Sequence, residues 1–75
     1  MFCDVFYDDS LDATITPGFD LPPYHVESFR SGWHCVCNRN GFNVLHYPNG
    51  RVFTSLENAK ILCDRFNAEY KLNRT

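Results

Sequence analysis

The stretch that decides the fold runs from residue 32 to residue 41 and reads GWHCVCNRNG. Its side chains alternate, with Trp33, Cys35 and Cys37 on one face of an extended backbone. A period of two residues is typical of a β-strand. Asn40-Gly41 follows directly, and both residues accept the positive φ angles that a two-residue hairpin turn requires. The stretch therefore predicts a strand that ends in a hairpin.

The chain after this turn predicts two more strands and a helix. Residues 42–47 form the second strand, Pro48-Asn49-Gly50 a turn, and residues 51–53 a third strand. The helix begins at Thr54 or Ser55, where Thr54 and Glu57 fit a capping box. Apolar residues then recur at helical spacing and form one stripe, which comprises Leu56, Ala59, Leu62, Cys63, Phe66 and Tyr70.

These elements predict an α+β fold of the βββα type. The stripe would pack on one face of a three-stranded antiparallel sheet, because a helix must bury its apolar side against another layer. We expect residues 25–75 to form this domain and residues 1–24 to form an extended N-terminal arm, with a short strand at residues 2–7. Pro17-Gly18 and Pro22-Pro23 interrupt the arm, so we expect it to be partly ordered at best.

Formal charge is divided unequally between these two parts of the chain. Residues 1–30 contain six acidic side chains and one basic side chain, a net charge of −5. Residues 31–75 contain three acidic and six basic side chains, a net charge of +3. The sequence therefore predicts an acidic arm against a mildly basic domain.

The sequence also bears on the cellular compartment. No apolar stretch approaches the roughly 20 residues that span a bilayer, and the first residues lack the basic and apolar regions of a signal peptide. We expect a cytoplasmic protein with no membrane partner and with reduced thiols.

Cysteine and histidine are the residues that would carry metal or catalytic chemistry. Cys35 and Cys37 could ligate zinc together with a further residue from the set His34, His46, Cys63 and Cys3. Structural zinc sites usually place cysteine pairs on tight turns, whereas these two thiols lie mid-strand. Free cysteine is also among the most buried residue types. Nucleophilic catalysis would need an activating base and an oxyanion hole, and the sequence supplies no oxyanion hole. We therefore expect buried thiols, no catalytic residues, no metal and no cofactor.

Arginine and tryptophan side chains near the strand ends are the candidates for partner binding. Arg30, Arg39 and Arg51 flank the predicted strands, and Trp33 adds a ring on a sheet face that the helix leaves open. Alternatively, Arg39 and Arg51 are ordinary charges beside turns. A sequence pI near 5.8 opposes tight binding to phosphates, so direct binding of nucleic acid is expected to be weak.

Three short motifs resemble the bacterial cell division activator CedA. They are Pro22-Pro23-x-His25, Ser28-Phe29-Arg30-x-x-Trp33 and Phe53-Thr54-x-x-Glu57-x-Ala59, and with spacing changes between them they cover roughly residues 22–67. The resemblance implies an arm, three strands and a helix, in a regulator that binds double-stranded DNA and associates with RNA polymerase. Arg30 and Trp33 would carry over most directly. That family is basic whereas this chain has a net charge of −2, so association with a protein surface agrees better with its charge.

The sequence predicts a non-enzymatic regulatory protein of a bacterium or phage. In the first hypothesis it docks on a large nucleic-acid machine such as RNA polymerase, through Trp33, Arg30 and the acidic arm. In the second, carboxylates of the arm, including Asp8, Asp9 and Asp12, imitate DNA phosphates and inhibit a host DNA-handling or defence enzyme. In the third, an exposed strand edge pairs with a second copy, so the protein is a homodimer instead of a monomer.

Overall fold

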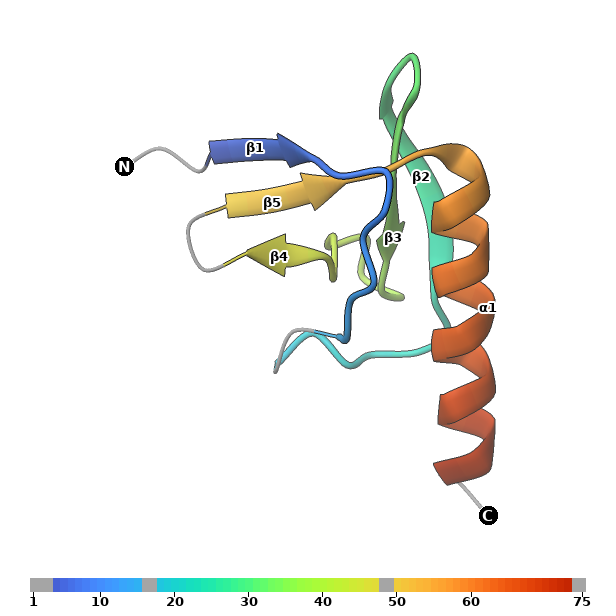
Figure 1. Cartoon of the computed structure of the whole chain (residues 1–75). Helices are drawn as coiled ribbons and strands as arrows, with labels where there is room; N and C mark the ends of the chain where they lie inside the picture. The colour runs from blue at the N-terminus through green and yellow to red at the C-terminus, as the bar shows by residue number, and fades with distance from the viewer. Residues whose placement is uncertain (1–3, 16–17, 48–49, 74–75) are drawn as a thin grey trace.

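The computed structural model describes residues 4–15, 18–47 and 50–73, with side chains to residue 69 (Figure 1). The order of elements is five strands followed by one helix. They are β1 (Asp4–Tyr7), β2 (His25–Arg30), β3 (Trp33–Cys37), β4 (His46–Tyr47), β5 (Gly50–Phe53) and α1 (Leu56–Asn73). The α+β class and the C-terminal helix are confirmed.

The strands form two sheets, so the prediction of a single three-stranded antiparallel sheet is wrong. One sheet has the order β1-β5-β4, with β1 parallel and β4 antiparallel to β5. The other pairs β2 with β3 in an antiparallel hairpin. An antiparallel bridge between His34 and Thr54, with two backbone hydrogen bonds of 2.8 Å, joins the sheets. Helix α1 packs against β2 and β3, and the three-stranded sheet projects to the other side (Figure 1).

The strand predicted over residues 42–47 is reduced to β4 because Asn43 replaces strand pairing with side-chain hydrogen bonds. Its Oδ1 accepts a bond from the Leu45 amide at 2.8 Å, and its Nδ2 donates to the Val52 carbonyl at 3.0 Å. Asparagine favours such local bonds over a regular ladder. A turn forms near the predicted Asn40-Gly41, but it spans residues 38–41, and of the two predicted positions only Gly41 has a positive φ, of 87°. Of the turn predicted over residues 48–50, residues 48 and 49 lie outside the described residues, and Gly50 is the first residue of β5.

Helix α1 begins one residue later than the predicted capping box requires. Ser55 is the N-cap, because its Oγ accepts a hydrogen bond from the Asn58 amide at 3.2 Å. Thr54 is instead fully buried, where its Oγ1 accepts a bond from Asn58 Nδ2 at 2.8 Å. The predicted apolar stripe is buried except at Leu56, which is 43% exposed; the side chain of Tyr70 lies outside the described residues.

The buried core lies between α1 and the strands. The largest apolar side chains that it buries fully are Val36, Val44, Leu45, Val52, Leu62 and Phe66. Tyr24 closes one end of this core: its ring meets the edge of Phe66 with centroids 5.9 Å apart. Asn67 of α1 accepts a hydrogen bond from the Tyr24 amide and donates one to the Tyr24 carbonyl.

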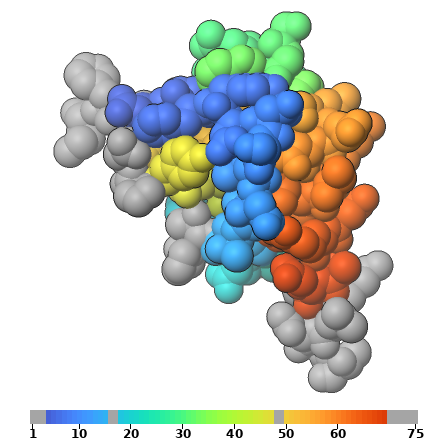
Figure 2. Space-filling model, viewed as in Figure 1, coloured from blue at the N-terminus to red at the C-terminus, as the bar shows by residue number. Residues whose placement is uncertain are grey.

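The N-terminal segment is packed against the domain, which differs from the expected partly ordered arm. Leu11, Ala13, Ile15 and Phe19 are half-buried against the core. Figure 2 shows the segment that follows β1 crossing the front of the molecule between the strands and α1. The segment contacts the core through these apolar residues, which are spaced along its length. Residues 2 and 3 of the predicted first strand lie outside the described residues. No helix in the described part of the chain is long and apolar enough to cross a bilayer.

Candidate functional site

The turn between β2 and β3 gathers two predicted binding residues. Arg30 pairs with Trp33 across the hairpin, and the register shifts between Ser28 and Arg30. This bulge leaves Phe29 as an extra residue beside the pair. Gly32 turns the chain at a φ of 80°, which glycine adopts without steric cost.

Aromatic rings from three parts of the chain meet at this turn. The ring of Phe29 stacks on that of Phe53 from β5, with centroids 4.6 Å apart and planes at 23°. The ring centroid of Trp33 lies 6.0 Å from that of Phe53 and 5.2 Å from that of Tyr7 in β1. Two features cause this meeting: the His34–Thr54 bridge holds β3 to the end of β5, and the parallel pairing sets Tyr7 beside Phe53.

Two arginines lie against these rings. The guanidinium carbon of Arg30 is 4.7 Å from the centroid of Phe29 and 5.2 Å from that of Trp33. The guanidinium carbon of Arg51 is 5.9 Å from the centroids of both Phe29 and Phe53. Each cation–π contact at an exposed position contributes about 0.5–1 kcal/mol, enough to bias the orientation of a flexible side chain. We refer to Tyr7, Phe29, Arg30, Trp33 and Arg51 as the aromatic–arginine surface.

This surface exposes apolar area that the fold itself does not cover. Tyr7 and Phe29 are each 42% exposed, although Phe53 beneath them is only 2% exposed. Both arginines are exposed, and Trp33 is half-buried. An apolar patch rimmed by polar groups marks an interaction site, and tryptophan, tyrosine and arginine are the residue types most enriched at binding hot spots.

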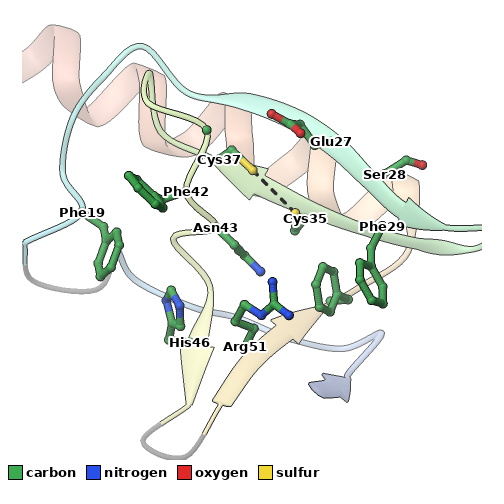
Figure 3. A pocket seen from close by; sticks show the side chains of 12 residues that line it. Phe19, Glu27, Ser28, Phe29, Cys35, Cys37, Phe42, Asn43, His46 and Arg51 are labelled. Atoms are coloured by element: carbon green, nitrogen blue, oxygen red, sulfur yellow. Dashed lines mark hydrogen bonds between the residues drawn. The ribbon is translucent and has the colours of Figure 1, made fainter. Parts of the chain in front are cut away.

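A pocket of about 290 Å³ opens beside the surface, between the two sheets (Figure 3). Phe29 and Phe53 line one end, Phe19 and Phe42 line the other, and Arg51 lies between them. The pocket is therefore walled by aromatic rings and contains a cation, an arrangement that can accept an apolar side chain with an acidic neighbour.

His46 and the paired thiols also line this pocket. Burial and the nearby Arg51 charge both lower the pKa of His46, which favours the neutral form of its ring. The hydrogen bond between Cys35 and Cys37 lowers the pKa of Cys35 and raises that of Cys37, and burial raises the Cys37 pKa further. Cys37 is thereby held protonated, the form that is a poor nucleophile.

The other predicted binding residues are not part of the aromatic–arginine surface. Arg39 is exposed in the turn at the far end of β3, where its amide donates to the Leu21 carbonyl. Asp9 is exposed beside β1. Asp12 forms an ion pair with Arg65 of α1 at 2.6 Å.

Asp8 is engaged within the fold. Its carboxylate accepts hydrogen bonds from the Tyr47 hydroxyl at 2.7 Å and from the Ser10 hydroxyl at 2.9 Å. These bonds lower the pKa of Asp8 below its ordinary 3.8. The structure thus brings together Arg30, Trp33 and Arg51, whereas Asp8 and Asp12 are engaged by other side chains of the fold.

Sequence reasoning did not select Tyr7 and Phe29. Tyr7 reaches the surface only through the parallel pairing of β1 with β5, which joins segments more than 40 residues apart in sequence. Phe29 gave a local signal, because it lies beside Arg30 in the motif Ser28-Phe29-Arg30 that resembles CedA. The chain matches no protein-family model, no curated protein and no solved structure.

Proposed function

We propose that this protein is a small non-enzymatic regulator that binds a large protein partner through the aromatic–arginine surface. The observation that carries the proposal is the convergence of three aromatic rings and two guanidinium groups from four strands on one exposed patch. The contacts within the patch hold these side chains in place before binding. Preorganisation of this kind reduces the entropy that binding costs.

The chemistry of the surface specifies the kind of partner. Arg30 and Arg51 favour a carboxylate, and the rings of Phe29 and Trp33 favour an apolar or aromatic side chain. The segment bound on the partner is therefore acidic with an apolar anchor that enters the adjoining pocket. RNA polymerase is the leading candidate, since the resemblance to CedA implies it, and the protein would act in the cytoplasm of a bacterium or phage-infected cell.

Direct binding of DNA is supported less well than binding of a protein. Arginine beside aromatic rings can stack on bases, but a net charge of −2 and a pI near 5.8 oppose attraction to phosphates. Inhibition by DNA mimicry also has weaker support, because Asp8 and Asp12 are already engaged by Tyr47 and Arg65. DNA mimicry does not require the aromatic–arginine surface.

Co-purification of RNA polymerase with the tagged protein tests the proposal. Arg30→Glu reverses a charge within the surface, and Arg39→Glu makes the same change at an exposed arginine outside it. Phe29→Ser removes an exposed ring, and Ile61→Ser is its control on α1, where Ile61 is 59% exposed. Loss of a hot-spot side chain costs about 2 kcal/mol or more, which is a loss of affinity of about 30-fold.

The proposal requires Arg30→Glu and Phe29→Ser to lose the polymerase while both control variants retain it. Equal retention by all four variants would refute the surface as the binding site. Loss only on neutralising Asp9 and other exposed carboxylates of the N-terminal segment would favour DNA mimicry instead. Sedimentation at micromolar concentration tests the homodimer, because a mass near 8.7 kDa identifies a monomer.

A further inference from the structure

The face of the β2–β3 hairpin that carries the two thiols also carries a histidine and a carboxylate. The antiparallel register sets His25 opposite Cys37 and Glu27 opposite Cys35. Side chains directly opposite each other in such a pair share a face, and so do residues two apart on one strand. His25, Glu27, Cys35 and Cys37 therefore occupy four adjacent positions on one face of the hairpin.

Three of these donors converge, and Cys35 adjoins them through Cys37. A ring nitrogen of His25, a carboxylate oxygen of Glu27 and the Cys37 sulfur all lie within 4.8 Å of one another, and the Nε2 of His25 lies 2.5 Å from Oε2 of Glu27. The sulfurs of Cys35 and Cys37 are 3.7 Å apart (Figure 3). In a tetrahedral zinc site with Zn–S bonds of about 2.3 Å, two sulfurs lie about 3.8 Å apart. The thiol pair therefore already has the separation that a shared zinc ion requires.

We propose that His25, Glu27, Cys35 and Cys37 bind one zinc ion. Two sulfurs, one imidazole nitrogen and one carboxylate oxygen make a four-ligand set of the types that zinc accepts. The sulfurs select zinc over magnesium or calcium, which take oxygen ligands. The two thiols lose their protons to solvent as the metal–sulfur bonds form, and a ring nitrogen of His25 and a carboxylate oxygen of Glu27 each donate a lone pair to the metal. The complex of Zn²⁺ with three anionic ligands has a net charge of −1.

Burial differs across the site in a way that permits metal entry. Cys35 and Cys37 are 4% and 3% exposed at the base, whereas the side chains of His25 and Glu27 are 47% and 48% exposed at the rim. An ion can therefore meet the rim ligands first and the thiols second. The guanidinium of Arg51 contributes positive charge near Cys35, which offsets part of the surplus negative charge.

The metal would have a structural consequence for the aromatic–arginine surface. It would fasten β2 to β3 at the His25–Cys37 end of the hairpin, and the opposite end carries Arg30 and Trp33. Chains of this size gain substantially from a metal staple because their cores are small. The proposed ligands His25 and Glu27 differ from the further zinc ligands that the sequence offered. Of those, Cys63 lies on the buried stripe of α1, and Cys3 lies outside the described residues.

Titration of the reduced, chelator-washed full chain with Co²⁺ and then Zn²⁺ tests this site. Cobalt bound by thiolates in a tetrahedral site gives a thiolate-to-metal charge-transfer band and intense visible bands. These bands disappear when zinc displaces the cobalt. We expect one ion per chain, and a rise in melting temperature on adding zinc. His25→Ala and Glu27→Gln change exposed rim residues, so they should fold, and each should weaken zinc binding at least tenfold.

Matched variants separate the site from adventitious binding. Cys37→Ser should abolish the charge-transfer band, whereas Cys63→Ser, at another buried thiol, should retain it. His34→Ala, on the neighbouring strand position, should bind zinc like the unaltered chain. The proposal fails if the unaltered chain gives no charge-transfer band. It also fails if His25→Ala and Glu27→Gln bind zinc as tightly as His34→Ala does.

Discussion

Gly50→Ala tests the parallel pairing that brings Tyr7 to the aromatic–arginine surface. A Cβ at Gly50 would lie 2.1 Å from the carbonyl oxygen of Asp4 and 2.9 Å from the ring of Phe6. Ordinary contacts begin near 3.4 Å, so β1 must move away by more than an ångström. The obstacle is backbone, which cannot rotate aside as a side chain can. The substitution should therefore displace β1 from β5.

The expected cost is about 1–3 kcal/mol, the range for forcing extra atoms into a packed site. A protein of this length has a free energy of unfolding of roughly 4–11 kcal/mol, at ~0.05–0.15 kcal/mol per residue. Each kcal/mol lowers the melting temperature by roughly 4–8 °C in a domain of this size. Urea denaturation measures the cost, and hydrogen exchange at the Asp8 amide reports on β1, because that amide donates to the Phe53 carbonyl at 2.9 Å.

Gly32→Ala is the control for the loss of a glycine. Gly32 has a φ of 80°, and no atom lies within 4 Å of the point that a Cβ would occupy, so the cost of roughly 1–2 kcal/mol comes from backbone conformation alone. Only Gly50→Ala should speed exchange at Asp8 beyond the change in global stability. Gly50 itself does not have a positive φ. If β1 were not paired there, alanine would be neutral or stabilise the fold by about 0.4–1 kcal/mol, and that result would refute the topology.

Three further predictions concern the core, the helix cap and pH. Phe66→Ala should lower the free energy of unfolding in urea by about 3–5 kcal/mol, because Phe66 is 1% exposed and little can fill its space. Ser55→Ala should cost about 1 kcal/mol in the same assay through loss of the N-cap, whereas Glu57→Ala should cost less, since Glu57 completes no capping box. The folded-state pKa of Asp8 is lowered, so its ionised form stabilises the fold above pH 3.8 and this contribution is lost as pH falls through the folded pKa. Melting temperatures of the unaltered chain and Asp8→Asn should therefore converge toward acid pH; a difference that stays constant below pH 3.8 would contradict this.

Local sequence patterns predicted part of the fold for physical reasons. The alternation at Trp33, Cys35 and Cys37 predicts β3, because burial on a strand has a period of two. The stripe of α1 follows equally from helical periodicity. Each signal is contained within one continuous segment of the chain.

The remaining strands depend on contacts between distant segments. β2 contains Glu27, Ser28 and Arg30, and all but one of its six residues are exposed, so no apolar pattern marks it. It is a strand because β3 pairs with it. The partner of β1 is likewise fixed by its pairing with β5, which no pattern within residues 4–7 contains.

The candidate site shows the same division. Arg30 and Trp33 could be selected from the sequence because the β2–β3 turn sets them side by side. Arg51 joins them only through the junction of the two sheets. The sequence could not show that Arg51 belongs to the surface and Arg39 does not, since both lie beside turns. The juxtaposition of His25 and Glu27 with the thiols also depends on the pairing of β2.

Photo-crosslinking from position 29 is the most direct test of the aromatic–arginine surface as the binding site. A photoreactive phenylalanine analogue in place of Phe29 preserves the ring, and the same analogue at Ile61 samples an exposed position on α1. In the presence of RNA polymerase, we expect position 29 to crosslink to one polymerase subunit, at an acidic segment, and position 61 to give no product. Crosslinking from position 61 alone, or equally from both positions, would contradict the assignment of function to this surface.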